Sequence, residues 1–234
     1  MKRIVGGTGA AAQRNRRNRP GPPRQMIKTA DSRPRPARAP RPSVTPEPPT
    51  STFEDGEGSR MVRAFHDATA GWSPPPTARW KTDGAADQRE ATGDWVVCHN
   101  DLAPWNTTFT EGQPVAFIDW DLAAPGPRMW DIAFAAWHFT PLYETDQWPT
   151  DPFVPRGQRV RLLADAYGLE SAARIALPAV VLARMEHTWK VFHDQARAGD
   201  PAYQRLWQAG AGDGIRRQIN YVTRNRSALH DALA

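Results

Sequence analysis

The chain has 234 residues and a formal net charge of +5, but its charges and prolines are unevenly distributed. Residues 1–50 contain 12 Lys and Arg against 2 Asp and Glu, together with ten prolines, so residues 51–234 carry a net charge of −5. Cys98 is the single cysteine, which excludes an internal disulfide and favours a reducing, cytoplasmic setting. No apolar run approaches about eighteen residues, which argues against a membrane span.

The first segment, residues 1–58, is predicted to be a disordered leader rich in Arg and Pro. It has too few large apolar side chains to offset the entropy lost on ordering. Clustered arginines can bind nucleic acid through its phosphates, but residues 13–50 contain no aromatic side chain that could stack on bases. Nucleic acid is therefore a disfavoured partner, and a solvated segment is the preferred interpretation.

Residues 59–234 are predicted to form one domain, α+β and mostly helical, with a short β-hairpin. The apolar spacing predicts a first helix from about Met61 that ends at Gly71. Two short apolar strands follow, Trp95–Cys98 and Val115–Ile118, with a Glu111-Gly112 turn between them.

The remainder of this domain reads as helical after a break at Pro125-Gly126-Pro127. Pro178 should either kink the third of these helices or delay its start, because proline cannot donate to the helical ladder. The expected helices span residues 128–139, 157–167, 171–198 and 202–231.

The strongest local signal is the segment His99–Asn106, which reads H-x-D-x-x-x-x-N, followed by Asp119 thirteen residues after the asparagine. Such a pairing arises by chance in about one chain of several thousand. Kinase-like enzymes use this arrangement to place a carboxylate at the acceptor hydroxyl and two oxygen ligands on magnesium. Asp101 can accept the hydroxyl proton, whereas Asn106 and Asp119 offer the hard oxygen ligands that Mg²⁺ prefers. His99 is expected to bond the backbone of the loop.

Three stretches together resemble the aminoglycoside phosphotransferase family: V-V-C-H-N-D-L-A-P-W-N, F-I-D-W-D and P-G-P-R-M-W-D-I-A, all between Arg60 and Leu142. The resemblance implies a kinase-like C-terminal lobe that moves the γ-phosphate of ATP or GTP, with Mg²⁺, to a hydroxyl of a small molecule. It implies Asp101 as the catalytic residue, Asn106 and Asp119 as metal ligands, and a structural role for Asp131.

The family also has an N-terminal lobe with a strand lysine that grips the nucleotide, and residues 1–58 have no such pattern. Neither Lys2 nor Lys28 lies in an alternating apolar strand. We therefore expect a catalytic lobe without its nucleotide lobe, with weak or absent turnover. The alternative is a non-catalytic, kinase-derived module that binds a partner or nucleic acid through its basic tail. A metal hydrolase built on His99 and Asp101 is disfavoured, because no further ligand cluster follows.

Overall fold

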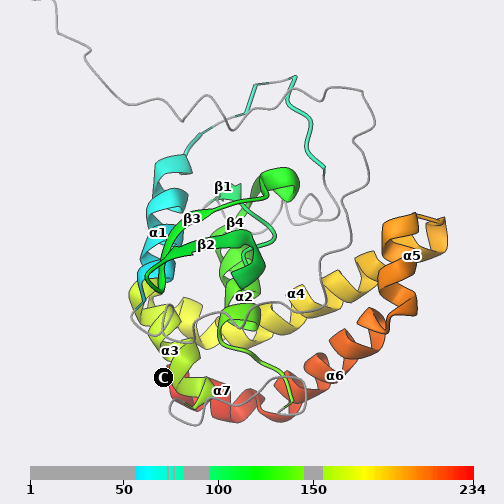
Figure 1. Ribbon diagram of the computed structural model, residues 1–234. Helices are drawn as coiled ribbons and strands as arrows, with labels where there is room; N and C mark the ends of the chain where they lie inside the picture. Colours follow the sequence, from blue (N-terminus) through cyan, green and yellow to red (C-terminus); the bar gives the residue numbers. More distant parts are fainter. Residues whose placement is uncertain (1–55, 73, 76, 82–94, 145–154) are drawn as a thin grey trace, which may run out of the picture.

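The computed structural model describes residues 56–72, 74–75, 77–81, 95–144 and 155–234. Helices dominate these residues, and two small antiparallel sheets lie among them (Figure 1). The mostly helical architecture agrees with the prediction. The predicted leader falls almost entirely on residues 1–55, which lie outside the described residues. Its last two positions belong to the first helix, which begins at Glu57.

The strands pair differently from the expected hairpin. β1 (Trp95–Cys98) pairs with β4 (Ala124–Pro127), whereas β3 (Gln113–Phe117) pairs with β2 (Thr107–Thr110). The two strands predicted from the sequence therefore lie in different sheets, and the hairpin is formed by β2 and β3. Its turn is the expected Glu111-Gly112 pair, and both residues have positive φ, as a tight two-residue hairpin requires.

The Pro-Gly-Pro segment was expected to interrupt the chain, yet it forms most of β4. Proline is tolerated there because each strand of a two-stranded sheet has an unpaired edge, so a missing N–H need not break the ladder. Gly126 also allows close approach to β1, since a Cβ at this position would lie 3.1 Å from Cys98 Sγ. The prediction of a simple break was wrong because a local proline signal cannot reveal a partner strand distant in sequence.

Four helices occupy nearly the ranges expected from the sequence. They are α1 (Glu57–Thr69), α2 (Arg128–Phe139), α3 (Arg156–Tyr167) and α4 (Ser171–Ala198). In α3 the apolar positions Val160, Leu163 and Tyr167 are all buried, which is the helical periodicity that predicted it. Helix α4 already starts at Ser171 and includes Pro178, so proline does not delay it.

The C-terminal region is not the single helix expected for residues 202–231. It consists of α5 (Pro201–Gln208), α6 (Ala211–Arg224) and α7 (Arg226–Leu233). Gly210 adopts a left-handed conformation with φ 87°, which separates α5 from α6. The periodicity of apolar residues continues across this turn, so the pattern alone concealed the break.

Helix α4 is the central element of the core. It runs across the molecule, with α2 against it, and α5 and α6 pack along its C-terminal part (Figure 1). The core of the described residues is filled by large buried side chains, including Trp137 of α2, Leu163 of α3, and Leu177 and Met185 of α4. Within the described residues, no helix has both the length and the apolar character needed to cross a membrane. This helical base supports the loops that follow β1 and β3.

Candidate active site

The loop after β1 brings Asp101 and Asn106 into direct contact. The side-chain amide Nδ2 of Asn106 donates to Asp101 Oδ2 at 2.6 Å and to the main-chain oxygen of Asp101 at 2.9 Å. A short 3₁₀ turn, Pro104–Asn106, makes this return possible, and Asn106 is buried at its end. Because the amide nitrogen points to Asp101, the amide oxygen is the side-chain atom of Asn106 suited to ligate a cation.

The environment of Asp101 favours proton binding more than that of an ordinary aspartate. Burial is the main cause that raises the pKa of this carboxyl above its usual 3.8, and the negative charge of Asp119 raises it further. The hydrogen bond from Asn106 and the positive charge of Arg184 oppose the shift without cancelling it. A partly buried carboxylate with raised proton affinity is suited to accept a hydroxyl proton.

The second loop is tied to the first through Ile118. Its main-chain N–H donates to Asn106 O at 2.8 Å, and its carbonyl accepts from His99 Nε2 at 3.0 Å. Asp119, the next residue, has φ 63°, a left-handed conformation that Asp and Asn adopt more readily than most residues. The structure thus places Asp119 beside the Asp101–Asn106 pair, near enough to affect the pKa of Asp101.

His99 uses both ring nitrogens within this loop structure. Nε2 donates to the Ile118 carbonyl, so Nδ1 is the acceptor for the main-chain N–H of Asp101 at 3.3 Å. The ring is fully buried and packs on Trp120, with 4.3 Å between ring centroids. This backbone-bonding role agrees with the expectation for His99. In the part of the chain that the structure describes, no group of three or more His, Cys, Asp or Glu could hold a metal ion.

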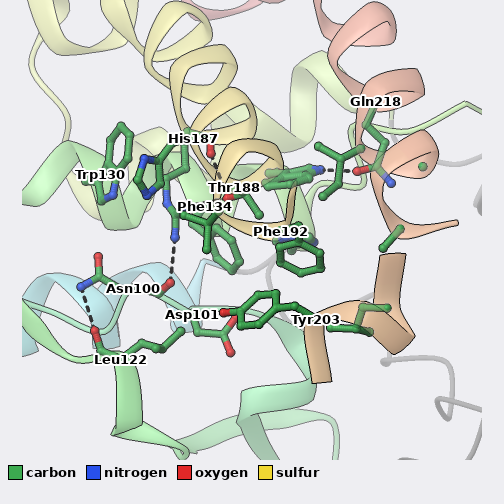
Figure 2. Close-up of a pocket in the computed structure, with 18 of the residues that line it drawn as sticks. Asn100, Asp101, Leu122, Trp130, Phe134, His187, Thr188, Phe192, Tyr203 and Gln218 are labelled. Atoms are coloured by element: carbon green, nitrogen blue, oxygen red, sulfur yellow. Dashed lines mark hydrogen bonds between the residues drawn. The ribbon is translucent and has the colours of Figure 1, made fainter. Parts of the chain in front are cut away.

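Asp101 also faces a large cavity between the loop and the helices. The cavity has a volume of about 580 Å³, within the range of small-molecule pockets. Its wall is formed by side chains of α2, α4, α5 and α6, and Figure 2 shows the Tyr203 ring extending from α5 toward Asp101. Asn106 and Asp119 are not among the lining residues. Asp101 therefore lies between this pocket and the two predicted cation ligands.

A comparison with family models identifies the group to which this molecule is related. The model of the phosphotransferase enzyme family matches residues 42–169, which is more than half of the chain. The chain belongs to this family. The match includes both loops of this phosphotransferase-family chain and the helices α1 to α3, and the resemblance inferred from the motifs is confirmed.

Two individual proteins are similar to this phosphotransferase-family chain. One is the trifolitoxin immunity protein of Rhizobium leguminosarum bv. trifolii, 36% identical over 117 residues, which are 49% of this chain and 44% of the relative. The chain thus spans less than half the length of this relative. The other is a solved structure from Ralstonia eutropha JMP134, provisionally assigned as an aminoglycoside phosphotransferase. Its identity is 16% and its TM-score 0.47, and the match covers 78% of this chain and 68% of that one.

Asp131 has a larger role than its sequence position indicated. The sequence favoured a structural charge at the start of α2, but the carboxylate is fully buried and accepts two main-chain bonds from the loop that follows β1. His99 N donates to Oδ2 at 2.6 Å and Asn100 N donates to Oδ1 at 2.7 Å. His66 Nε2 lies 3.2 Å from Oδ2, and its Nδ1 contacts the Tyr167 hydroxyl at 2.7 Å. Asp131 therefore connects the loop to α1 and α3.

Arg184 was not identified from the sequence. This α4 residue donates through Nη2 to the carbonyl of Asn100 at 2.8 Å and through Nη1 to Thr188 Oγ1 at 2.6 Å. Its guanidinium lies over the rings of Phe134 and Trp130, 4.5 and 5.2 Å from their centroids. Burial lowers the pKa of Arg184 to about 10, so it stays charged at neutral pH. Arg184 thereby holds the loop through the Asn100 carbonyl, whereas Asp131 holds it through main-chain N–H groups.

Asn100 shows why both contacts are needed. Its φ is 64°, a left-handed conformation in which residues other than glycine are uncommon. Asp131 binds its N–H, Arg184 binds its carbonyl, and its own side-chain Nδ2 donates to Leu122 O at 3.0 Å. These contacts hold the residue in a conformation that the backbone occupies less often than the helical or extended ones. Here the left-handed conformation of Asn100 sets the direction in which the chain continues to Asp101.

Proposed function

We propose that the chain transfers the γ-phosphate of ATP or GTP to a hydroxyl group of a small molecule. The family membership supports phosphoryl transfer as the reaction class. The observation that carries the residue assignment is the 2.6 Å bond between Asn106 and Asp101, beside Asp119 and at the wall of a pocket of about 580 Å³. A phosphotransferase needs this combination of a base, two oxygen ligands and a place for the acceptor.

In this proposal Asp101 accepts the hydrogen bond and then the proton of the acceptor hydroxyl. The hydroxyl oxygen forms a bond to the γ-phosphorus, the bond to the bridging oxygen breaks, and the nucleoside diphosphate leaves with that electron pair. Asn106 has two roles in this proposal, since its amide nitrogen orients Asp101 and its amide oxygen would be a ligand of the cation. Asp119 would supply a carboxylate ligand. When bound, Mg²⁺ would neutralise charge on the phosphates.

Binding of magnesium nucleotide should raise the thermal unfolding midpoint of the chain, because a ligand that binds only the native state stabilises it. At a concentration 100 times the dissociation constant, the gain is about 2.7 kcal/mol. The measurement is differential scanning fluorimetry with ATP or GTP, each with Mg²⁺ and with EDTA. Asp119→Asn should lose most of the shift that depends on Mg²⁺, since it loses a charged ligand.

Asp231→Asn is the matched control. Asp231 lies on α7, where its side chain is 76% exposed, and it should retain the full shift. Equal Mg²⁺-dependent shifts in Asp119→Asn and in the control would contradict the ligand assignment. Absence of any nucleotide shift, combined with salt-sensitive retention on nucleic acid that requires residues 1–50, would instead favour the non-catalytic binding module.

A further inference from the structure

Six aromatic side chains contribute to the wall of the pocket at Asp101. They come from the loop and three helices (Figure 2): Trp105, Trp130, Phe134, Trp137, Phe192 and Tyr203. Trp137 and Phe134 are largely buried and fixed by the core, whereas Phe192 meets Tyr203 edge-to-face at 5.3 Å between centroids. Planar side chains on several walls provide stacking and edge contacts for a flat, apolar ligand.

The charged side chains of this pocket also favour an uncharged ligand. Among the described residues that line it, Asp101 is the single carboxylate, whereas Lys81 and Arg184 are cations. Arg184 donates its hydrogen bonds to the neutral acceptors Asn100 O and Thr188 Oγ1, and its charge is attracted by Asp101 and by the buried Asp131. His138, also in the wall, has its pKa held well below 6.5 by burial, so it is neutral at pH 7 and adds no charge to the pocket.

A cationic ligand would be poorly accommodated by such a wall. Each ammonium group moved out of water needs a counter-ion or several acceptors, and without them its desolvation is strongly unfavourable. The carboxylate that could pair with one ammonium is Asp101, which the reaction needs for the hydroxyl. Arg184 and Lys81 would repel any further positive charge.

Building on the proposed function, we infer that the acceptor is an uncharged hydroxyl compound with a flat, apolar, ring-bearing body. The ring system lies among the aromatic side chains of α2, α4 and α5, and the hydroxyl reaches Asp101. A polycationic aminoglycoside does not fit this combination of charge and surface. The pocket thus restricts the substrate class more narrowly than the phosphoryl-transfer site does.

A matched pair of small molecules distinguishes the effect of ligand charge on binding from the effect of ligand shape. 2-Naphthalenemethanol is neutral and carries a hydroxyl, whereas 2-naphthylmethylamine has the same rings and a positive charge at pH 7. Kanamycin serves as the polycationic probe. Binding is measured by isothermal titration calorimetry without nucleotide, so the result does not depend on phosphate transfer. We expect the neutral probe to bind at least about tenfold more tightly than either cation, a ratio that corresponds to one uncompensated charge near the surface.

Two variants place a new carboxylate inside and outside the pocket. Leu206 lines it and is 45% exposed, so Leu206→Glu should be tolerated and should raise the affinity for 2-naphthylmethylamine about threefold to tenfold. Ile175 on α4 is 53% exposed and does not line the pocket, so Ile175→Glu should leave all three affinities unchanged.

A third variant tests the aromatic wall. Phe192→Ala should weaken the binding of the neutral probe about fivefold, because one ring contact is lost.

The results separate this inference from the proposed function. Kanamycin or the amine binding as tightly as the neutral probe would overturn the substrate class, and so would absence of saturable binding of the neutral probe. Equal effects of Leu206→Glu and Ile175→Glu would overturn the placement of the ligand. Failure of the proposed function would appear instead as the absence of any magnesium-nucleotide shift in the melting experiment, whichever probe binds.

Discussion

Replacing Asp101 by asparagine should reduce phosphate transfer by about 10²- to 10⁴-fold, the usual contribution of a general base. The variant keeps an oxygen that can accept the hydrogen bond from Asn106, so the loop should remain folded. It cannot accept the hydroxyl proton. The assay is transfer of labelled phosphate from ATP in single-turnover format, which detects slow reactions.

The pH dependence of turnover provides a second test of the role of Asp101. Because burial raises the pKa of Asp101 above 3.8, turnover should decline on acidification at a higher pH than an exposed aspartate would give. Activity is lost as pH falls through the raised pKa, since the base must be deprotonated. Asp231→Asn is the control. Turnover in Asp101→Asn equal to that of this control would remove Asp101 from the catalytic role.

Replacing Asp131 by alanine should lower the free energy of unfolding by about 3–5 kcal/mol, as expected when one partner of a buried charged network is removed. The main-chain N–H groups of His99 and Asn100 would lose their acceptor, and His66 would lose its carboxylate partner. Urea unfolding followed by tryptophan fluorescence measures the change. If the alanine variant does not fold, Asp131→Asn can be measured in its place. This variant keeps one acceptor oxygen, so its loss of unfolding free energy should be smaller than the loss expected for alanine.

The contribution of Asp131 should also depend on pH in a defined direction. Burial by itself would raise the pKa of this carboxyl, but the hydrogen bond from His66 and the bonds and charges around His99 lower it below 3.8. A depressed pKa means that the stabilisation is fully present above about pH 5 and is lost as pH falls through the folded-state pKa. The difference between wild type and Asp131→Ala should therefore shrink below about pH 4. A loss no greater than that of Asp231→Ala at pH 7 would contradict this role.

Much of the fold could be predicted because its helices carry a clear apolar periodicity. The helices that contain Trp137, Leu163 and Met185 lie nearly where the spacing placed them. The predictions were wrong where the same local sequence pattern is compatible with more than one tertiary structure. Gly210 separates α5 from α6 within a continuous periodic pattern, and Pro125-Gly126-Pro127 becomes a strand because β1 lies beside it. Neither outcome is encoded within a short window.

The sequence by itself determined the local chemistry of this protein. Asp101 and Asn106 are five residues apart, and a proline turn between them is enough to bring their side chains together. Asp119 follows a short strand that the hairpin returns to the same loop. Contacts of this kind depend on few backbone angles, so the spacing of the motif predicts them.

Only the tertiary structure decided how the loop is held and which side chains line the pocket. Asp131 binds His99 across 32 residues of sequence, and Arg184 binds Asn100 across 84. The aromatic wall combines side chains from α2, α4 and α5, whose relative positions follow from packing of the whole core. Nothing in the local pattern fixes such distances, because they arise when helices distant in sequence bury their apolar faces against one another.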